Sequence, residues 1–563
     1  MKRTLRLQSR DLLAAFAGVA LTAAFPKFNL AGLAWLAPGL ILLAGLGTGN
    51  GGAFRAGYVA GLAHFLTSLY WLLFIPFPVG AVAGWLALCL YLALYPAAWV
   101  WLCWRTSPAR NLSASGGWRH AAEQFFRTPW WQRAAWAVLC AALWVALEMV
   151  RARLFTGFPW NLLGVSQFEF LPVIQIAAVS GVYGVSFLIA WLSVSLAMGL
   201  LRLARHPKPL WRWMAELRLA LVGLLLVAIY GVNRLSPTAA SDRTLNVALV
   251  QPSIRQEMIW DHSADQERFD KIIGWSRLAL LSGPDLLIWP ESSTPDLSDA
   301  NFQIITNLIA THKVWMILGA NDMELSDRAA GVGEYDAFNA AHLFDPNGRF
   351  VASYRKQHLV AFGEYLPLAR GLPFLRRIIP VPGDFTPGDR PVTFEMSGPS
   401  ARFSVLICFE DVVSGLARRA VSEDLDFLLN LTNDGWFGES AAQWQQAANA
   451  VFRAVENGLP LVRCTNNGLT CWIDERGRIR QIFADDAGNV YAPGFMTASI
   501  PLLAAGQVRE PTFYHRYGDW FGWLCIALGG TACVYKSILR KASALRPGSC
   551  SAESMRAGFH SHA

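Results

Sequence analysis

The sequence predicts two parts, an α-helical polytopic membrane domain of about eight spans and an α/β sandwich domain. The first observation is composition: 54% of the 563 residues are hydrophobic and only 16% are charged, with a mean hydropathy of +0.31. That is too apolar for an ordinary soluble enzyme. The second is distribution, because long apolar runs fill residues 11–233 and 519–539, whereas residues 244–510 carry mixed charge.

Eight apolar runs are close to the roughly 20 residues that cross the hydrocarbon core of a bilayer. They cover residues 11–26, 30–47, 56–75, 80–104, 134–150, 178–204, 213–233 and 519–539. The first run lacks a clear cleavage site, so we expect it to be retained rather than removed as a signal peptide. The predicted parts are a seven-span N-terminal membrane domain (1–235), a globular domain (244–510), a final membrane helix (519–540) and a tail (541–563).

Lysine and arginine gather in alternate loops, which sets the orientation of a membrane protein. The N-terminus, the 105–133 loop, the 202–212 turn and the C-terminal tail are rich in basic residues, whereas the intervening loops hold few. All of these basic segments fall on one side of an eight-span path. We therefore expect both termini in the cytoplasm and the 244–510 domain outside it.

Several features exclude function classes. The net charge of +8 does not indicate nucleic-acid binding, because the basic residues gather at the ends of apolar runs. The segment GTGNGG (47–52) fits GxGxxG but lies between two spans, so we interpret it as a flexible turn. Neither a Walker A motif nor HExxH occurs, and the nine cysteines form no CxxC pair. We therefore expect no cofactor or metal, and whether Cys464 and Cys471 pair stays open.

Within 244–510, short β-rich runs alternate with helical patterns, which is typical of an α/β sandwich. The predicted strands cover residues 244–251, 285–291, 314–320, 340–345, 350–356, 403–409, 427–433, 460–468 and 471–477. The predicted helices cover residues 264–281, 299–311, 412–422 and 441–457. Glycine and proline cluster around 363–392, which predicts a long loop region.

The stretch RFSVLICFEDVV (402–413) contains the candidate nucleophile. A β-rich apolar run ends on Cys408, and a helix-like segment follows. Such a turn exposes the sulfur, and a helix N-terminus favours the thiolate. Taken alone, a buried structural cysteine explains the same pattern.

Three charged residues favour the nucleophile. Glu291 ends a strand in DLLIWPES, Lys356 follows the run FVASYRK, and Glu364 comes eight positions after Lys356 in apolar surroundings. A nearby carboxylate can take the proton of a thiol, whose ordinary pKa is about 8.5. A nearby ammonium can stabilise the thiolate and the oxyanion formed on a carbonyl. Taken singly, Glu291 is also explained as a solvated side chain at a strand end and Lys356 as a surface lysine, whereas a carboxylate in the apolar surroundings of Glu364 needs a partner or shifts its pKa.

The order Glu291, Lys356, Cys408, each at a strand end, resembles the nitrilase (carbon–nitrogen hydrolase) superfamily. The frames WPE, YRKxHLVxFGEYLP and ICFED resemble it too. The resemblance implies an αββα sandwich with a Glu-Lys-Cys triad. Seven spans, this domain and one further span are similar to bacterial apolipoprotein N-acyltransferases, as are FGEYLP, NLTNDGWFG and RCTNNGLT. One departure is Phe409, where that family often has a tyrosine.

This resemblance implies acyl transfer from a membrane phospholipid to the α-amino group of the S-diacylglyceryl cysteine of an apolipoprotein, through a thioester on Cys408. It also implies a bacterial inner membrane, with the 244–510 domain in the periplasm. We expect Glu291 to act as the base and Lys356 to stabilise the oxyanion. We expect Glu364 to orient Lys356 or the incoming amine.

Supporting roles are predicted for further residues. We expect Glu410 to hold the loop after the nucleophile, although a carboxylate is also favoured at a helix start without that role. The segment GLPFLRRIIPVPGDF (371–385) predicts a mobile lid at the membrane interface, with a hydrophobic loop packed on its own domain as the alternative. The residues expected to contact substrate or line its entrance are Trp260, Phe362, Tyr365, Trp436 and Phe437.

Two other functions stay open. A membrane-anchored amidase would use the same triad with water as the acceptor, although eight spans are excessive for an anchor. A transporter or scaffold with an inactive domain would carry acid residues in its spans, because intramembrane charges mark transport pathways. Glu148, within the predicted span 134–150, is weak support for that function.

Overall fold

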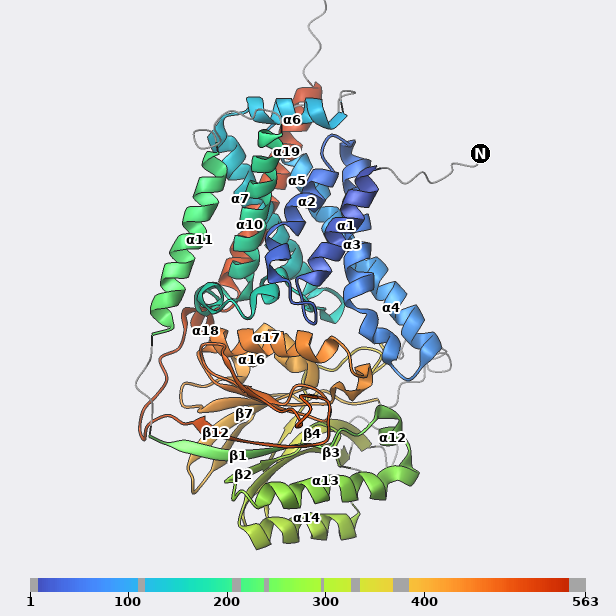
Figure 1. Ribbon diagram of the computed structural model, residues 1–563, viewed down its shortest axis with the longest axis vertical. Coiled ribbons are helices and arrows are strands. Elements are labelled where there is room, and N and C mark those ends of the chain that lie inside the picture. Colours follow the sequence, from blue (N-terminus) through green and yellow to red (C-terminus); the bar gives the residue numbers. More distant parts are fainter. Residues whose placement is uncertain are drawn as a thin grey trace, which may run out of the picture.

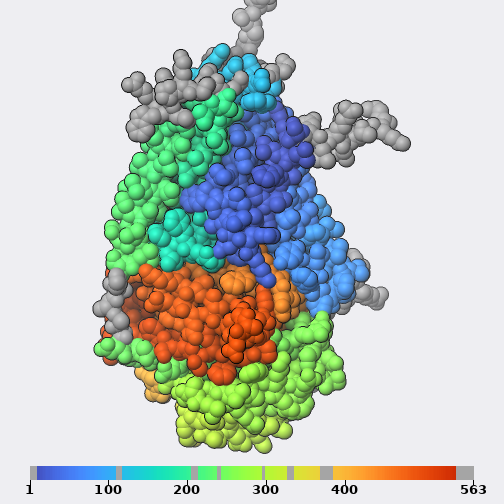
Figure 2. All heavy atoms as spheres, in the orientation of Figure 1, coloured from blue at the N-terminus to red at the C-terminus, as the bar shows by residue number. Residues whose placement is uncertain are grey.

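The computed structural model describes residues 9–109, 117–204, 214–236, 242–294, 298–325, 335–367 and 384–545. A helical bundle, the membrane domain, stands on a two-sheet domain formed by residues 244–510, the sheet domain (Figure 1). The space-filling view shows the orange residues of the sheet domain lying directly against the blue and teal helices of the membrane domain (Figure 2). The sheet domain is therefore packed on the bundle as well as tethered to it.

The membrane domain is built from helices of very different length. They are α1 (Ser9–Ala23), α2 (Ala37–Ala44), α3 (Gly49–Ser68), α4 (Pro78–Leu92), α5 (Leu94–Arg105), α6 (Gly117–Arg127), α7 (Trp130–Arg151), α8 (Leu171–Ile174), α9 (Ala177–Ser180), α10 (Val182–Leu203), α11 (Ala215–Arg234) and α19 (Trp520–Leu545). Short 3₁₀ turns lie between them: η1 (Ala31–Trp35), η2 (Tyr70–Phe74), η3 (Leu154–Thr156) and η4 (Leu163–Gln167).

Among the described residues, five helical segments are long and apolar enough to cross a membrane. They are Pro78–Arg105, Trp130–Arg151, Val182–Leu203, Ala215–Arg234 and Trp520–Leu539. The predicted run 30–47 instead forms η1 and the eight-residue α2. The membrane character of the chain is confirmed, and the number of eight spans stays a prediction.

Small residues let the bundle helices approach closely. A β-carbon on Gly57 of α3 would lie 2.4 Å from the Pro96 carbonyl oxygen of α5. The GTGNGG segment has a similar packing role, and the interpretation of all six residues as a flexible turn is wrong. Gly49 already begins α3, while Gly47 adopts a φ of +69° and its missing side chain leaves room for Gly117 of α6.

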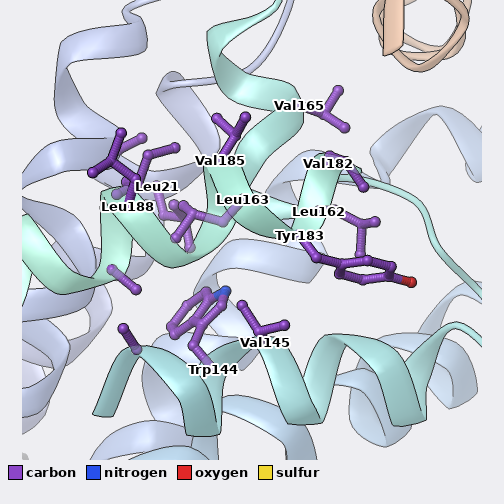
Figure 3. Packing of buried hydrophobic residues seen from close by; sticks show 14 of the residues in the cluster. Leu21, Trp144, Val145, Leu162, Leu163, Val165, Val182, Tyr183, Val185 and Leu188 are labelled. Atoms are coloured by element: carbon purple, nitrogen blue, oxygen red, sulfur yellow. The ribbon is translucent and has the colours of Figure 1, made fainter. Parts of the chain in front are cut away.

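The interior of the membrane domain is a continuous apolar core. Close to its centre, α7 and α10 pack on the segment around η4, with Trp144, Leu163 and Leu188 turned toward one another (Figure 3). The same cluster of buried side chains continues through Val451 and Val455 into the sheet domain. Burial of this apolar surface joins the two domains into one packed unit.

The sheet domain contains two six-stranded sheets. The first has the order β12-β1-β2-β3-β4-β5, from β1 (Thr244–Gln251), β2 (Leu286–Ile288), β3 (Trp315–Leu325), β4 (Tyr335–Phe344), β5 (Phe350–Arg355) and β12 (Gly494–Pro501). The second has the order β11-β10-β9-β8-β7-β6, from β6 (Thr393–Met396), β7 (Ala401–Ile407), β8 (Phe427–Thr432), β9 (Leu461–Thr465), β10 (Cys471–Ile473) and β11 (Ile479–Ile482).

Helices cover the outer face of each sheet, which confirms the αββα sandwich. The first sheet is covered by α13 (Asp265–Leu280) and α14 (Asp299–His312), at the bottom of Figure 1. The second is covered by α16 (Ser414–Ala420) and α17 (Ala442–Asn457), which face the bundle. The remaining helical pieces are α12 (Gln256–Trp260), η6 (His262–Ala264), η7 (Cys408–Val412), η8 (Asp434–Phe437) and α18 (Phe513–Tyr517).

The boundaries around the candidate nucleophile differ from the prediction. The strand ends at Ile407 rather than at residue 409, and the 412–422 helix is the shorter α16. Between them, η7 takes the chain around a tight turn. In the second sheet β7 is parallel to β8, and β8 is parallel to β9. The carboxyl ends of these strands therefore meet at one edge, next to the membrane domain.

Candidate active site

Cys408 lies at a strained turn directly after β7. Its φ is +54°, in the left-handed region that residues other than glycine seldom adopt. The side chain is partly exposed, and the residue opens the 3₁₀ turn η7 where the sequence predicts a helix start. Strain of this kind clusters at functional turns, where the surrounding structure must hold it in place.

Glu410 provides much of that support. Its Oε2 accepts hydrogen bonds from the Ile407 N–H (2.7 Å) and the Tyr354 hydroxyl (2.9 Å). Its Oε1 accepts from the N–H groups of Gln357 (2.7 Å) and His358 (3.0 Å). Burial raises the pKa of this carboxyl to about 7, while the hydrogen bonds act in the opposite direction. Glu410 thus binds the turn after β7 to the segment after β5.

Lys356 lies between two carboxylates. Its Nζ is 3.3 Å from Glu291 Oε1 and 2.8 Å from Glu364 Oε1, and the side chain is 1% exposed. Asn339 donates to the same two oxygens, at 2.7 Å and 2.9 Å. The second oxygen of Glu291 accepts from the Asn433 N–H at 2.8 Å. Residues from both sheets thus converge on Glu291.

The electrostatics of this group determine the resting state of the thiol. Burial first, and then Glu291, raise the pKa of Cys408 well above its usual value, although Lys356 acts to lower it. For Lys356 burial lowers the pKa, but Glu291, Glu364 and Cys408 more than offset this and hold it well above its usual value. The expected helix start is a 3₁₀ turn, and burial and Glu291 both oppose the thiolate there, whereas Lys356 favours it.

The predicted entrance residues lie at three places around this group. Trp260 of α12 is 37% exposed and meets Trp436 of η8 edge-on, with ring centroids 5.2 Å apart. Phe362 is exposed at a φ of +66°, and its N–H donates to the carbonyl oxygen of the half-buried Tyr365. Phe437 packs edge-on against Trp71 of the membrane domain at 4.6 Å. Most of the predicted lid, residues 371–383, lies outside the described residues.

An aromatic surface of the membrane domain lies directly on the nucleophile turn. We call Trp71, Phe158 and Trp160 the aromatic wall. Phe409 stacks on Trp160 with centroids 6.0 Å apart and planes at 6°, and on Phe158 at 6.3 Å and 24°. His358 stacks on Phe409 at 5.9 Å and 18°. The stacked ring of Phe409 therefore joins the nucleophile turn to the bundle.

A buried charge network that the sequence did not reveal lies behind the turn. Arg463 of β9 pairs with Asp411 and, at 3.4 Å, with Asp434, and all three are at most 1% exposed. Burial raises the pKa of Asp434 to about 7, although Arg463 acts to lower it. Asp434 lies in the frame NLTNDGWFG and Arg463 in RCTNNGLT, and these frames were the only sign in the sequence that the two residues belong to the site. Within the described ranges, no group of three or more His, Cys, Asp or Glu side chains could hold a metal ion.

Glu148 has a local structural role in the membrane domain. Its Oε1 accepts hydrogen bonds from the Trp144 indole N–H (2.9 Å) and from the Leu163 N–H (2.7 Å). One turn further along α7, the Arg151 carbonyl accepts from the Phe158 N–H at 2.9 Å. These two residues of α7 thus hold both ends of the segment 158–163, which carries Phe158 and Trp160 of the aromatic wall.

Comparison with known proteins gives matches along most of the chain. Residues 17–195 match the apolipoprotein N-acyltransferase N-terminal domain, and residues 246–502 match the carbon–nitrogen hydrolase family. An apolipoprotein N-acyltransferase from Geobacter metallireducens is 36% identical over 94% of this chain and 96% of that protein. One from Rickettsia prowazekii is 29% identical over 83% of this chain and 86% of that protein. A solved amidase from Nesterenkonia sp. is 18% identical, covers 47% of this chain and 94% of the amidase, and has a TM-score of 0.34.

Proposed function

The chain belongs to the apolipoprotein N-acyltransferase family, and from that premise we propose the substrates and the chemistry of this acyltransferase. The acyl donor is a membrane phospholipid. The acceptor is the α-amino group of an apolipoprotein's N-terminal S-diacylglyceryl cysteine. The observation that supports this most is the Lys356 ammonium, held between Glu291 and Glu364 within electrostatic reach of Cys408.

In the first half-reaction, Glu291 takes the proton of the Cys408 thiol, and the sulfur attacks the ester carbonyl of the phospholipid. Lys356 stabilises the oxyanion that forms on that carbonyl. The ester carbon–oxygen bond then breaks, and the leaving oxygen takes the proton from Glu291. A lysophospholipid departs, and the acyl chain stays on Cys408 as a thioester.

In the second half-reaction, the apolipoprotein amine attacks the thioester carbonyl, and Glu291 takes a proton from the amine. The carbon–sulfur bond breaks, the sulfur of Cys408 takes that proton, and an amide forms. Glu364 keeps Lys356 in position throughout, because its Oε1 lies 2.8 Å from Nζ. An ester is exchanged for an amide, so the reaction runs downhill without ATP.

The location of the site supports a lipid donor. The aromatic wall brings apolar side chains of the membrane domain to the residue next to the nucleophile. Exposed apolar residues follow Trp71 along the chain, among them Phe74 of η2 and Phe77 and Val79 at the start of α4. We place the protein in a bacterial inner membrane, with the sheet domain in the periplasm, where a chain from the outer leaflet can reach Cys408.

A two-substrate assay tests this function. Purified protein is given a phospholipid and a synthetic diacylated lipopeptide, and both products are measured by mass spectrometry. We expect N-acylated lipopeptide and lysophospholipid in equal amounts. Lysophospholipid without N-acylated peptide would identify a lipase, and turnover of small amides alone would identify an amidase that uses the same residues.

A further inference from the structure

Helix α17 is polar, yet it is buried between the membrane domain and the second sheet. Gln443, Gln445 and Gln446 lie in its first turns, and each is at most 2% exposed. A buried amide must make its hydrogen bonds within the protein, because an unsatisfied one costs about 1–3 kcal/mol. The partners of these three side chains therefore show what each one holds in place.

Gln445 makes hydrogen bonds to several segments of the membrane domain. Its Oε1 accepts from the indole N–H groups of Trp160 (2.7 Å) and Trp71 (3.1 Å). Its Nε2 donates to the carbonyl oxygens of Pro26 (3.0 Å) and Ser68 (3.4 Å). One side chain of the sheet domain thus fixes two rings of the aromatic wall and the ends of α1 and α3.

The next residue along α17 binds the nucleophile turn. Gln446 Nε2 donates to the Cys408 carbonyl oxygen (2.9 Å) and to Asp411 Oδ1 (3.0 Å). Adjacent residues of one rigid helix therefore hold the nucleophile and the aromatic wall. The third glutamine, Gln443, donates to the Asp434 and Gly438 carbonyls and so holds the η8 loop.

We infer that Gln445 is a positioning residue for the lipid donor, and this inference rests on the proposed function. It sets Trp71 and Trp160 at a fixed place relative to Cys408, so that the ester of a membrane lipid meets the thiol in a reactive geometry. It touches none of the reacting atoms. A small water-soluble electrophile does not need the wall, so its reaction with Cys408 does not depend on Gln445.

The experiment compares two reactions of Cys408 in the purified full-length protein with Gln445→Met, which keeps the size of the side chain and removes its hydrogen bonds. One reaction is alkylation by iodoacetamide, and the other is thioester formation from phospholipid alone, both followed on the Cys408 peptide by mass spectrometry. We expect the alkylation rate to stay within about twofold of wild type. We expect thioester formation to fall by about tenfold or more, because small misplacements of a reactant have effects of that size.

Gln446→Met is the matched control on the neighbouring residue. It removes the hydrogen bond to the Cys408 carbonyl and leaves the contacts of Gln445 in place. The nucleophile turn itself should loosen in this variant. We expect alkylation and thioester formation to fall together in Gln446→Met, whereas in Gln445→Met only thioester formation should fall.

Gln445→Glu adds a readout that a purely structural role would not give. One carboxyl oxygen can accept from the two indoles, but the other faces the Pro26 and Ser68 carbonyls and must carry a proton to bind them. Burial favours that neutral form. Arg151 donates to the carbonyl oxygen of Asn161, whose side chain donates to Gln445 Oε1, and this cation favours the ionised form. At low pH we expect Gln445→Glu to form the thioester faster than Gln445→Met. This difference should disappear as the pH rises and the carboxyl ionises.

The outcomes separate the inference from the function on which it rests. Equal losses of alkylation and thioester formation in Gln445→Met would overturn the positioning role, as would unchanged thioester formation. A glutamate variant no better than methionine at any pH would also overturn it. A wild-type protein whose Cys408 is alkylated but never acylated by phospholipid would overturn the proposed function, and the inference with it.

Discussion

At the scale of single residues, the surroundings of Cys408 oppose the thiolate form of its side chain. Cys408 is held at a positive φ by Glu410, which accepts four hydrogen bonds across the turn. Burial and Glu291 raise its pKa, so the sulfur becomes reactive only when a base takes its proton. A thiol in this state resists adventitious oxidation, because the thiolate is the reactive form.

The raised pKa of Cys408 predicts a specific pH dependence. As long as the pH is below the pKa of a thiol, its thiolate fraction grows about tenfold for each unit by which the pH rises. We expect the iodoacetamide alkylation rate of Cys408 to rise continuously from neutral pH to beyond about pH 9. Rate measurements on the Cys408 peptide over that range check this. A plateau near neutral pH would show a preformed thiolate and contradict the assignment of Glu291 as base.

Lys356 gives the second prediction at this scale. In Lys356→Met the oxyanion loses its charged partner, and Glu291 and Glu364 lose the cation between them. We expect acyl transfer to fall by about 10²–10³-fold or more. Lys313→Met, at an exposed lysine at the end of α14, should transfer at the wild-type rate. Retention of activity in Lys356→Met would show that another group stabilises the oxyanion.

The sequence revealed the charged residues of the site but not their partners. Glu291, Lys356 and Cys408 could be recognised because each lies in a local frame at a strand end. Asn339 and Asn433 come from other strands and reach the site only through tertiary packing. Asn433 lies in the frame NLTNDGWFG, but nothing in the local sequence of either residue shows that it bonds Glu291.

At the scale of elements, the ends of the parallel strands of the second sheet are fixed by buried charge. Arg463 of β9 bridges Asp411 of η7 and Asp434 of η8. The two acids would otherwise repel each other and remain unpaired in the interior. Gln446 of α17 donates to Asp411 Oδ1. This network keeps η7 and η8 at a constant distance across the site.

Removal of the central arginine predicts a large loss of stability. Arg463→Met removes the cation that pairs with both Asp411 and Asp434, so we expect the free energy of unfolding to fall by about 3–5 kcal/mol. Arg402→Met breaks ion pairs with Glu395 and Asp424 on a side chain that is 41% exposed, so the loss should be much smaller, because water screens exposed ion pairs. Denaturant unfolding of the purified variants measures both losses. Similar losses in the two variants would contradict the structural role of the network.

The strands that the sequence missed share one property. Each of β6, β11 and β12 lies at the edge of its sheet, and β6 and β11 have four residues each. Short edge strands are half exposed and carry little apolar signal. The central strands β7, β8 and β9 are buried and apolar, and the runs 403–409, 427–433 and 460–468 predicted them within a few residues.

At the scale of the whole molecule, α17 is the place where the two domains become one. A soluble sandwich would expose this helix to water, whereas here its glutamines bind both the bundle and the nucleophile turn. The sequence predicted a domain tethered at its two ends. The packing of α17 under the bundle could not be predicted, because the partners of Gln445 lie more than 250 residues away in sequence.

The basic loops predict the orientation of the molecule in the membrane. Asn347→Cys, in an exposed turn of the sheet domain, should react with a membrane-impermeant maleimide added to intact spheroplasts. Arg119→Cys, on the helix α6 at the opposite end of the bundle (Figure 1), should react only after the membrane is opened. Labelling of the two positions in the reverse order would invert the proposed topology.

The central claim is that Cys408 carries an acyl chain taken from the bilayer. Purified protein is incubated with a phospholipid of defined chains and no acceptor, digested, and the Cys408 peptide is weighed by mass spectrometry. The account predicts that the peptide gains the mass of one acyl chain, that hydroxylamine removes it, and that Glu291→Gln prevents the gain. An unmodified Cys408 peptide in a preparation that still N-acylates a lipopeptide would contradict the account.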